Sequence, residues 1–357
     1  MKRILLYLLL FSSSFVIGQS KYSNEFLAIG TGARAKAMGN SFVAIVDDAT
    51  AGYWNPAGLL GIKSNLQIAL MHSEQFAGIA KNDFAAVAFP IDEKSTLAFS
   101  YIRFGVDDIP NTSQLIDAEG NINYDRITSF SAVDNAFIAS YARKLNVEGL
   151  SLGGNVKIIR RIIGEFADSW GFGLDAGAQY KRKSWQFGAT FRDFTGTFNA
   201  WNYTLSEEFK EVLDRTGNEL PSNGTEVTAP KLILGAAWGT PMGEKFDFLV
   251  EIDLDMTFDG RRNTMIATDF ASFDPHLGVE FGFKTIIYIR AGINNLQFST
   301  DQFDKKTLKV EPSIGIGIRL GHFYIDYALT NVGSASGTLY SNLFSLKFDI
   351  FKKNKDT

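Results

Sequence analysis

Few side chains in this sequence are of the kinds that most often carry catalytic or metal chemistry. His72, His276 and His322 are far apart and lack metal-ligand spacing such as H-E-x-x-H. The chain has no cysteine, which excludes disulfides, thiolate metal sites and cysteine nucleophiles together. No G-x-S-x-G nucleophile elbow occurs either. We therefore expect each histidine to lie at a strand end, and we expect no catalysis, no metal and no cofactor.

Regular alternation of apolar and polar residues predicts the elements that carry the remaining polar side chains. The last such segment runs from Phe344 to Ile350, with apolar residues at the even positions and polar residues at the odd positions. This period of two is typical of a strand with two unlike faces. Similar segments occur at 172–178, 185–192, 248–256, 287–293 and 314–320, and we count about fourteen along the chain.

The connections between these segments are alternately short and long. Short connections occur at 92–94, 181–183, 241–244 and 320–322, and long ones at 105–130, 197–229, 257–273 and 299–306. Tight turns at one end and long loops at the other are typical of a membrane barrel. We therefore predict an all-β fold, a transmembrane antiparallel β-barrel of about fourteen strands spanning 63–357, in preference to a soluble β-sandwich.

The composition agrees with such a barrel. The sequence holds 33 glycines, 31 phenylalanines and 12 tyrosines, although its mean hydropathy is only -0.02. A barrel presents apolar side chains to lipid and polar ones to its lumen, so its average hydropathy stays near zero. The net charge of -4 argues against a nucleic-acid partner, which needs a basic surface.

Charged residues on the alternating polar face of the C-terminal segments are expected to point into the lumen. Facing lipid at the midplane, an arginine or lysine would cost ~2–4 kcal/mol, and an acid somewhat less. Inside the barrel these groups can pair with one another and with Arg34 or Lys36. We therefore interpret them as structural ion pairs that hold a plug in place, in preference to a substrate pathway. The predicted lumen charges are Glu251, Asp253, Asp255, Glu280, Arg290, Arg319 and Asp326.

The N-terminus has the organisation of a secretory signal peptide. Lys2 and Arg3 precede the apolar run 4–11, and small to medium residues lead to a cut after Gly18. The run is too short for a helix that spans a bilayer, which argues against a retained anchor. We expect residues 1–18 to be removed and the mature chain to reside in the cell outer membrane, in contact with its lipid.

Residues 19–62 do not alternate and are predicted to form a hatch that plugs the lumen. Small residues dominate 30–39, and Asn55 precedes Pro56, a sequence that disfavours helix at the asparagine but allows a helix to begin at the proline. We expect short helices packed inside the barrel. The predicted hatch residues are Arg34, Asp47, Asp48, Trp54, Asn55 and Pro56.

This segment resembles a known family. The string GARAKAMGNSFVAIVDDATAGYWNPAGL at 32–59 is similar to the opening of the PorV/PorQ proteins of Bacteroidota, themselves similar to the FadL fatty-acid transporters. The resemblance implies a fourteen-stranded barrel with an N-terminal hatch that carries the Asn-Pro-Ala turn. It further implies, for PorV-type members, a role in type IX protein secretion, in which they associate with a large translocon and carry exported cargo. Asn40 stands where many relatives have glycine, a change that suits a positive φ.

Two functions are compatible with these features. The first is a non-enzymatic accessory or shuttle component of type IX secretion, whose long loops contact the translocon and exported cargo. The expected partner-contact residues in those loops are Phe130, Phe198, Trp201, Tyr203 and Phe209.

The alternative is a FadL-like transporter for hydrophobic small molecules. It would need an apolar pocket near the hatch and a lateral gap at a kinked strand, for which Gly153-Gly154 is the candidate. A nonspecific porin ranks third, because a filled lumen should conduct poorly.

Overall fold

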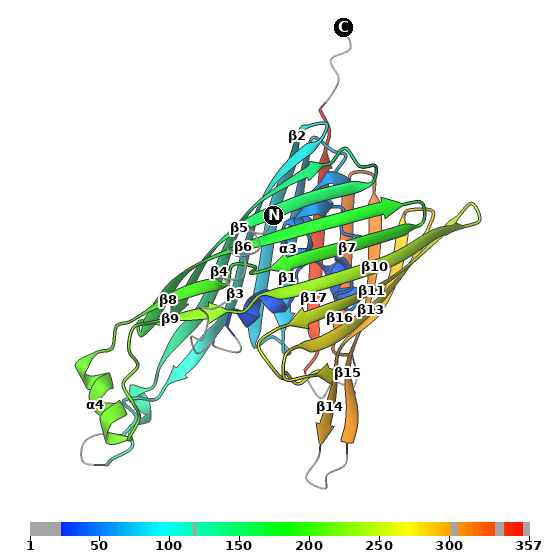
Figure 1. Cartoon of the computed structure of the whole chain (residues 1–357). Helices are drawn as coiled ribbons and strands as arrows, with labels where there is room; N and C mark the ends of the chain where they lie inside the picture. Colours follow the sequence, from blue (N-terminus) through cyan, green and yellow to red (C-terminus); the bar gives the residue numbers. More distant parts are fainter. Residues whose placement is uncertain (1–22, 117–119, 301–305, 333–338, 353–357) are drawn as a thin grey trace.

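The computed structural model describes residues 23–116, 120–300, 306–332 and 339–352. The predicted signal peptide, 1–18, lies outside these residues. Antiparallel strands form a closed wall, with short helical turns of the N-terminal segment inside it (Figure 1). The predicted fold class is confirmed: the wall is a closed antiparallel barrel of fourteen strands.

Closure is made by the first and last strands, which pair from Leu66↔Ile350 to Glu74↔Asn342. Two positions in the ring are made of two consecutive pieces, β7 with β8 and β9 with β10. The strands are β1 (Leu66–Gln75), β2 (Ala80–Asp92), β3 (Ser95–Asn111), β4 (Thr128–Lys144), β5 (Leu150–Ile163), β6 (Ala167–Arg182), β7 (Trp185–Arg192), β8 (Thr197–Tyr203), β9 (Gly224–Thr228), β10 (Lys231–Met242), β11 (Phe246–Thr257), β12 (Ile266–Ala267), β13 (Ser272–Phe283), β14 (Ile287–Thr300), β15 (Lys306–Leu320), β16 (Phe323–Thr330) and β17 (Ser341–Ile350).

The two ends of the barrel differ as the connections predict. The tight-turn end carries the turns at 93–94, 183–184 and 321–322 and both ends of the barrel wall, Leu66 and Ile350. The long-loop end carries the connections with η3 (Tyr124–Arg126), α4 (Glu207–Arg215) and the short strand β12. In Figure 1 the tight-turn end faces up and α4 faces down.

Each strand has one face toward lipid and one toward the lumen. On β11 the outward residues Phe248, Val250 and Ile252 alternate with Glu251 and Asp253, which are fully buried inside. An apolar outer face and internal pairing of all strands are what hydrocarbon requires of a spanning sheet. Among the described residues, no helix is long and apolar enough to cross a membrane.

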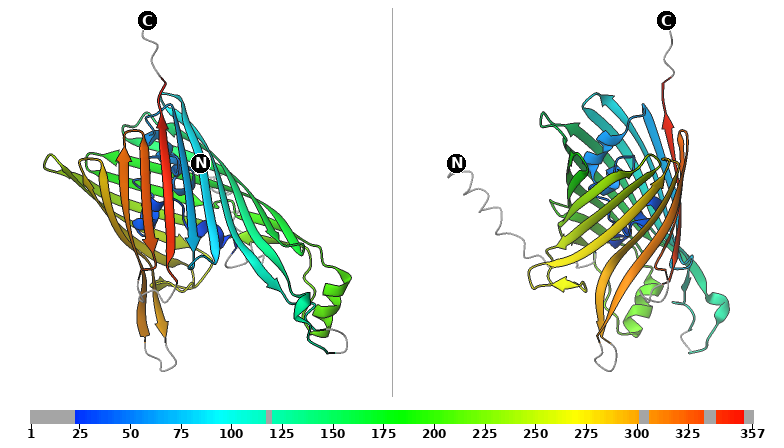
Figure 2. Two further views of the ribbon diagram at one scale, coloured as in Figure 1. Left: turned by 180° about the vertical axis from the view of Figure 1, so that it is seen from behind. Right: turned by 90° about the vertical axis from the view of Figure 1, so that its right-hand side faces the viewer.

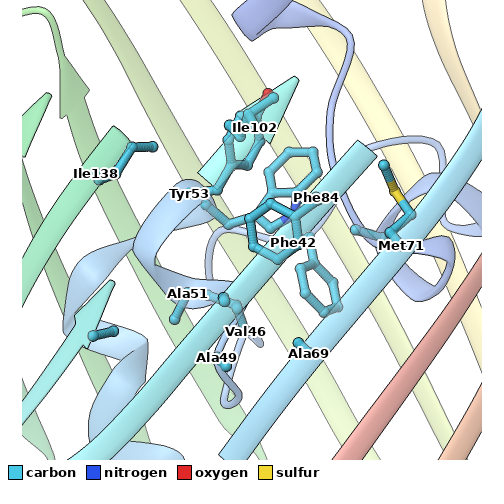
Figure 3. Close-up of a cluster of buried hydrophobic side chains, with 14 of the residues drawn as sticks. Phe42, Val46, Ala49, Ala51, Tyr53, Ala69, Met71, Phe84, Ile102 and Ile138 are labelled. Carbon is cyan, nitrogen blue, oxygen red and sulfur yellow. The ribbon is translucent and has the colours of Figure 1, made fainter. Parts of the chain in front are cut away.

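The hatch, taken here as residues 23–62, fills the lumen with η1 (Glu25–Ala28), α2 (Ala33–Ala37), α3 (Ala51–Trp54) and η2 (Pro56–Gly61). The views in Figure 2 show these turns enclosed by the strands. Its apolar side chains pack on the inner face of β1–β4, where Phe42 and Tyr53 lie near Phe84, Ile102 and Ile138 (Figure 3). The barrel therefore has a hydrophobic core made by the hatch.

Candidate functional site

Arg34 anchors the first helix of the hatch to the wall. Its guanidinium donates two hydrogen bonds to Glu280, Nε to Oε2 at 2.8 Å and Nη2 to Oε1 at 2.9 Å, and its Nη1 lies 3.3 Å from Asp47 Oδ1. Arg290 also contacts Glu280 at 2.6 Å and Asp326 at 2.6 Å. Two of the predicted hatch residues and three of the predicted lumen charges thus form one ion-pair network between the hatch and β13, β14 and β16.

A second anchor joins Asp48 to the last strand. Lys347 Nζ lies 2.8 Å from Asp48 Oδ2, and the other carboxylate oxygen accepts hydrogen bonds from the backbone N–H and hydroxyl of Thr50. Burial alone would raise the pKa of Asp48, but Lys347 outweighs it and the pKa falls to about 2. This carboxylate stays ionised in any ordinary solution.

The Asn-Pro turn lies directly against the wall. Asn55 is fully buried; its Nδ2 donates to the carbonyls of Val43 and Ala178, both at 2.9 Å, and its Oδ1 accepts from Ala57 N–H at 3.2 Å. Pro56 begins η2 and lies so close to β5 that a Cβ at Gly153 would come within 2.5 Å of its carbonyl carbon. Glycine is therefore required there to admit the turn.

The predicted kink at Gly153-Gly154 is wrong. β5 keeps one register with β4 and with β6 through both glycines, Gly153↔Ala142 and Gly154↔Ala176 among them. The pair makes room for the hatch rather than bending the strand.

Two acids of β11 hold the middle of the hatch. Asp253 accepts the backbone N–H groups of Phe42 and Val43 at 2.8 and 3.1 Å, and Glu251 accepts that of Ala44 at 2.7 Å. Both carboxylates are buried. These three N–H groups belong to no helix or strand, so the carboxylates of the wall supply the hydrogen-bond acceptors that they need.

Asp255, the third predicted acid of β11, lies next to a histidine whose position was predicted wrongly. Asp255 is ion-paired with Lys231, and His276 Nε2 lies 3.6 Å from Asp255 and 3.6 Å from Asp274. His276 Nδ1 is 3.0 Å from the carbonyl oxygen of Gly39 in the hatch. His276 thus lies inside the barrel and not at a strand end.

The other two histidines and Arg319 lie away from the hatch. His72 faces outward in the middle region of β1, again not at a strand end, whereas His322 lies in the turn after β15 as expected. Arg319 is exposed at the tight-turn end, with its guanidinium 4.9 Å from the Tyr324 ring centroid. Among the described residues, no group of three or more His, Asp or Glu could hold a metal ion.

Between the hatch and the long-loop end lies a cavity of about 850 Å³. Trp54, anchored through its indole N–H to the Thr31 carbonyl at 2.9 Å, and Tyr53 form part of its floor. Further apolar lining comes from residues on the hatch and on three strands, namely Phe26, Leu27, Phe104, Ile138 and Ile233. This volume lies within the range of small-molecule sites, although the lining holds more charged residues than such sites usually have.

The charges that line the cavity are mostly neutralised within its wall. Lys157, for example, contacts Asp175 at 2.8 Å as well as Asp193. Arg192 instead lies over the rings of Tyr53 and Trp54, 4.5 and 5.6 Å from their centroids, and no described carboxylate lies within 4.0 Å of it.

Lys36 is a second cation of the cavity, and among the described residues no carboxylate lies within 4.0 Å of it. Its Nζ donates to the Ile29 carbonyl at 2.6 Å, and burial lowers its pKa to about 8. Together with Arg192, it gives the cavity two cations that can meet a polar group of a ligand.

The wall is discontinuous beside this cavity, a feature that the sequence did not reveal. Residues 193–196 separate β7 from β8, with positive φ at Asp193 and Gly196. In the neighbouring position of the ring, Ala229-Pro230 separates β9 from β10. Among the described strands, β9 pairs only with β8, so no strand pairing continues from β9 to β11 beyond Lys231↔Thr257. Residues from both edges of this seam line the cavity.

The start of the hatch bridges the seam. Asn24 Nδ2 donates to the Thr228 hydroxyl at 2.7 Å on one edge, and Glu25 lies 3.3 Å from Arg262 in the connection that follows β11 on the other side. The signals for this interruption were the Asp-Phe-Thr-Gly sequence after β7 and the proline at 230, both typical of broken strands.

The aromatic residues expected in long loops are placed differently. Phe130, Phe198, Trp201 and Tyr203 lie in β4 and β8, because these strands extend beyond the predicted bounds; only Phe209 lies in a connection, on α4. Phe166 packs on Phe130 and on Phe209, Trp201 stacks on Tyr203, and Phe198 packs on Phe172. The rings stabilise the long-loop end of the barrel.

Comparisons with family profiles and with curated proteins give no match. Solved structures with similar folds include the Pseudomonas putida toluene transporter TodX, with a TM-score of 0.58 at 12% identity over 90% of this chain and 98% of that one. The CymD monoaromatic hydrocarbon channel gives 0.57 at 12% identity over 91% and 98%, and a Pseudomonas aeruginosa FadL homologue gives 0.51 at 13% over 89% and 98%. At such identities the likeness concerns architecture, and this chain has the FadL-like fold of a fourteen-stranded barrel.

Proposed function

We propose that this chain is an outer-membrane channel that binds a hydrophobic small molecule in the cavity above its hatch. The observation that carries the proposal is the position of the cavity, which has an aromatic floor on the hatch and reaches the seam between β9 and β11. The fold shared with a toluene transporter and a monoaromatic hydrocarbon channel supports it.

The seam gives such a ligand a route that avoids water. An apolar molecule gains free energy by passing from a binding site directly into hydrocarbon. The start of the hatch, from Ser23 into η1, crosses the described part of the seam through polar contacts of Ser23 and Asn24 with Thr228 and of Glu25 with Arg262. A displacement of this short segment would connect the cavity with the surroundings of the barrel, while the rest of the hatch stays anchored.

A role in type IX secretion remains the second candidate. It is favoured by the resemblance of residues 32–59 to the PorV/PorQ opening, and by the long-loop end, where α4 stands away from the barrel as a surface for a translocon or cargo protein (Figure 1). Neither the comparisons nor the site geometry adds support to it, so the small-molecule channel is the better supported function.

The test uses two phenylalanines of one strand that point to opposite faces. Phe104 lines the cavity, whereas Phe99 faces outward. Replacing Phe104 with alanine removes part of one aromatic contact, about 1 kcal/mol, so the affinity for toluene should fall roughly 5-fold. Uptake of radiolabelled toluene by cells that lack their own hydrocarbon channel should fall with Phe104→Ala and stay unchanged with Phe99→Ala. Equal uptake by both variants and by cells without the barrel would refute the proposal.

A further inference from the structure

The apolar band on the outside of the barrel is unequal in height. On β11 the outward residues are apolar from Phe246 to Met256, and on β6 from Trp170 to Tyr180. At a rise of ~3.3 Å per residue and a strand tilt of ~40°, each of these stretches spans roughly 25 Å, the height of a barrel's apolar band. On β1 the outward apolar stretch runs only from Leu66 to Leu70, about 10 Å by the same reckoning.

A row of polar residues ends the apolar stretch on four neighbouring strands. His72, Asp83, Arg103 and Asn135 are direct register partners across β1, β2, β3 and β4. His72 Nδ1 lies 2.7 Å from Asp83, and Arg103 lies 3.8 Å from the same carboxylate, with side chains 30–55% exposed. Polar side chains at this depth are expensive in contact with lipid, so this wall is poorly suited to face acyl chains alone.

Between this row and the tight-turn end, the same wall is hollowed. A groove of about 500 Å³ runs across the outward faces of β1–β5, with the small side chains Ala85 and Ala139 between the larger Leu70, Phe99 and Phe137. The strands that carry it lie side by side in the left view of Figure 2 (blue to teal). Large exposed side chains beside a groove can pack into the same groove of a second copy.

We propose that this β1–β4 wall is the interface with a second copy of this chain. The charges on this wall favour a second copy of the chain over a lipid headgroup as the molecule bound there. The row and its neighbours hold both signs, with Lys81 3.4 Å from Asp107 and Arg103 beside Asp83. A phosphate-bearing lipid would favour an excess of cations, whereas a two-fold interface pairs residue i with residue j twice and needs both signs on one surface.

The absence of cysteine from the chain allows a direct test. Ala85→Cys and Ala139→Cys each place one thiol in the groove, and Ala291→Cys places one on the outward face of β14, on the other side of the barrel. The full-length variants are oxidised with a membrane-permeant catalyst in intact outer membranes. Folding is checked by the resistance of the unheated barrel to detergent denaturation.

We expect a disulfide-linked product of twice the chain mass with Ala85→Cys or Ala139→Cys, at least ten times more abundant than with Ala291→Cys. Arg103→Glu in the same background should reduce it about tenfold, because the added acid repels the partner's acids. Cross-linking no stronger than that of Ala291→Cys, or a product whose mass reveals a different protein, would overturn the proposal. If Arg103→Glu does not fold, the comparison of the cysteine variants still decides.

Discussion

Replacement of Arg34 with alanine should loosen the hatch without unfolding the barrel. Arg34 donates two hydrogen bonds to Glu280 and contacts Asp47, and its side chain is only 22% exposed. Removing one partner of a buried pair costs about 3–5 kcal/mol, but Arg290 would still neutralise Glu280 at 2.6 Å. We therefore expect a loss of about 2–3 kcal/mol in the free energy of hatch opening.

Hydrogen exchange resolves this change by segment. Amide exchange over residues 32–47 should accelerate roughly 30- to 150-fold, while β11 and β13 keep their protection. Arg319→Ala is the matched control, because that arginine lies exposed at the tight-turn end. Exchange in Arg34→Ala within twofold of the Arg319→Ala variant would refute the view that the ion pairs seat the hatch.

Three further predictions concern the same segment. Asn55→Ala removes three buried hydrogen bonds and should destabilise the hatch by about 3 kcal/mol, seen as faster exchange over 40–58; unchanged exchange would contradict it. Gly177→Ala would bring a Cβ within 2.2 Å of Asn55 Oδ1 and should raise single-channel conductance by displacing the hatch, whereas Gly154→Ala, with 3.5 Å to its nearest neighbour, should not; equal conductance would count against the packing argument. The low pKa of Asp48 stabilises the folded state above the unfolded value near 3.9, and this contribution disappears as pH falls toward about 2. Cleavage of the hatch by pepsin should thus rise between pH 4 and 2, and Asp48→Asn should abolish that rise.

The barrel was predictable because apolar and polar residues alternate along each strand, which identifies its two faces. The segments at 248–256 and 314–320 needed no tertiary information, since lipid and lumen impose opposite polarity on neighbouring residues. The lengths of β4 and β8 were less accessible, because polar residues on an extended strand beyond the membrane look like loop residues. Phe130 and Trp201 were assigned to loops for that reason.

The contacts of the site were only partly predictable. Inward orientation of Glu280 and Arg290 follows from alternation, and Glu280 lies between Arg34 and Arg290 and contacts both. Which backbone groups Glu251 and Asp253 would hold depends on the path of the hatch, which no local pattern encodes. Glycines are ambiguous in the same way: Gly153 could mark a bend or a close approach, and only the position of Pro56 decides.

The most direct test of a hydrophobic ligand above the hatch is equilibrium binding to the purified full-length barrel. Radiolabelled toluene and a radiolabelled long-chain fatty acid would be titrated in mild detergent, with Phe104→Ala and Phe99→Ala in parallel. The account predicts saturable binding of one of these compounds at one site per chain, weakened only by Phe104→Ala. No saturable binding of either compound, with a large translocon barrel or exported cargo protein co-purifying instead, would contradict it and favour the secretion role.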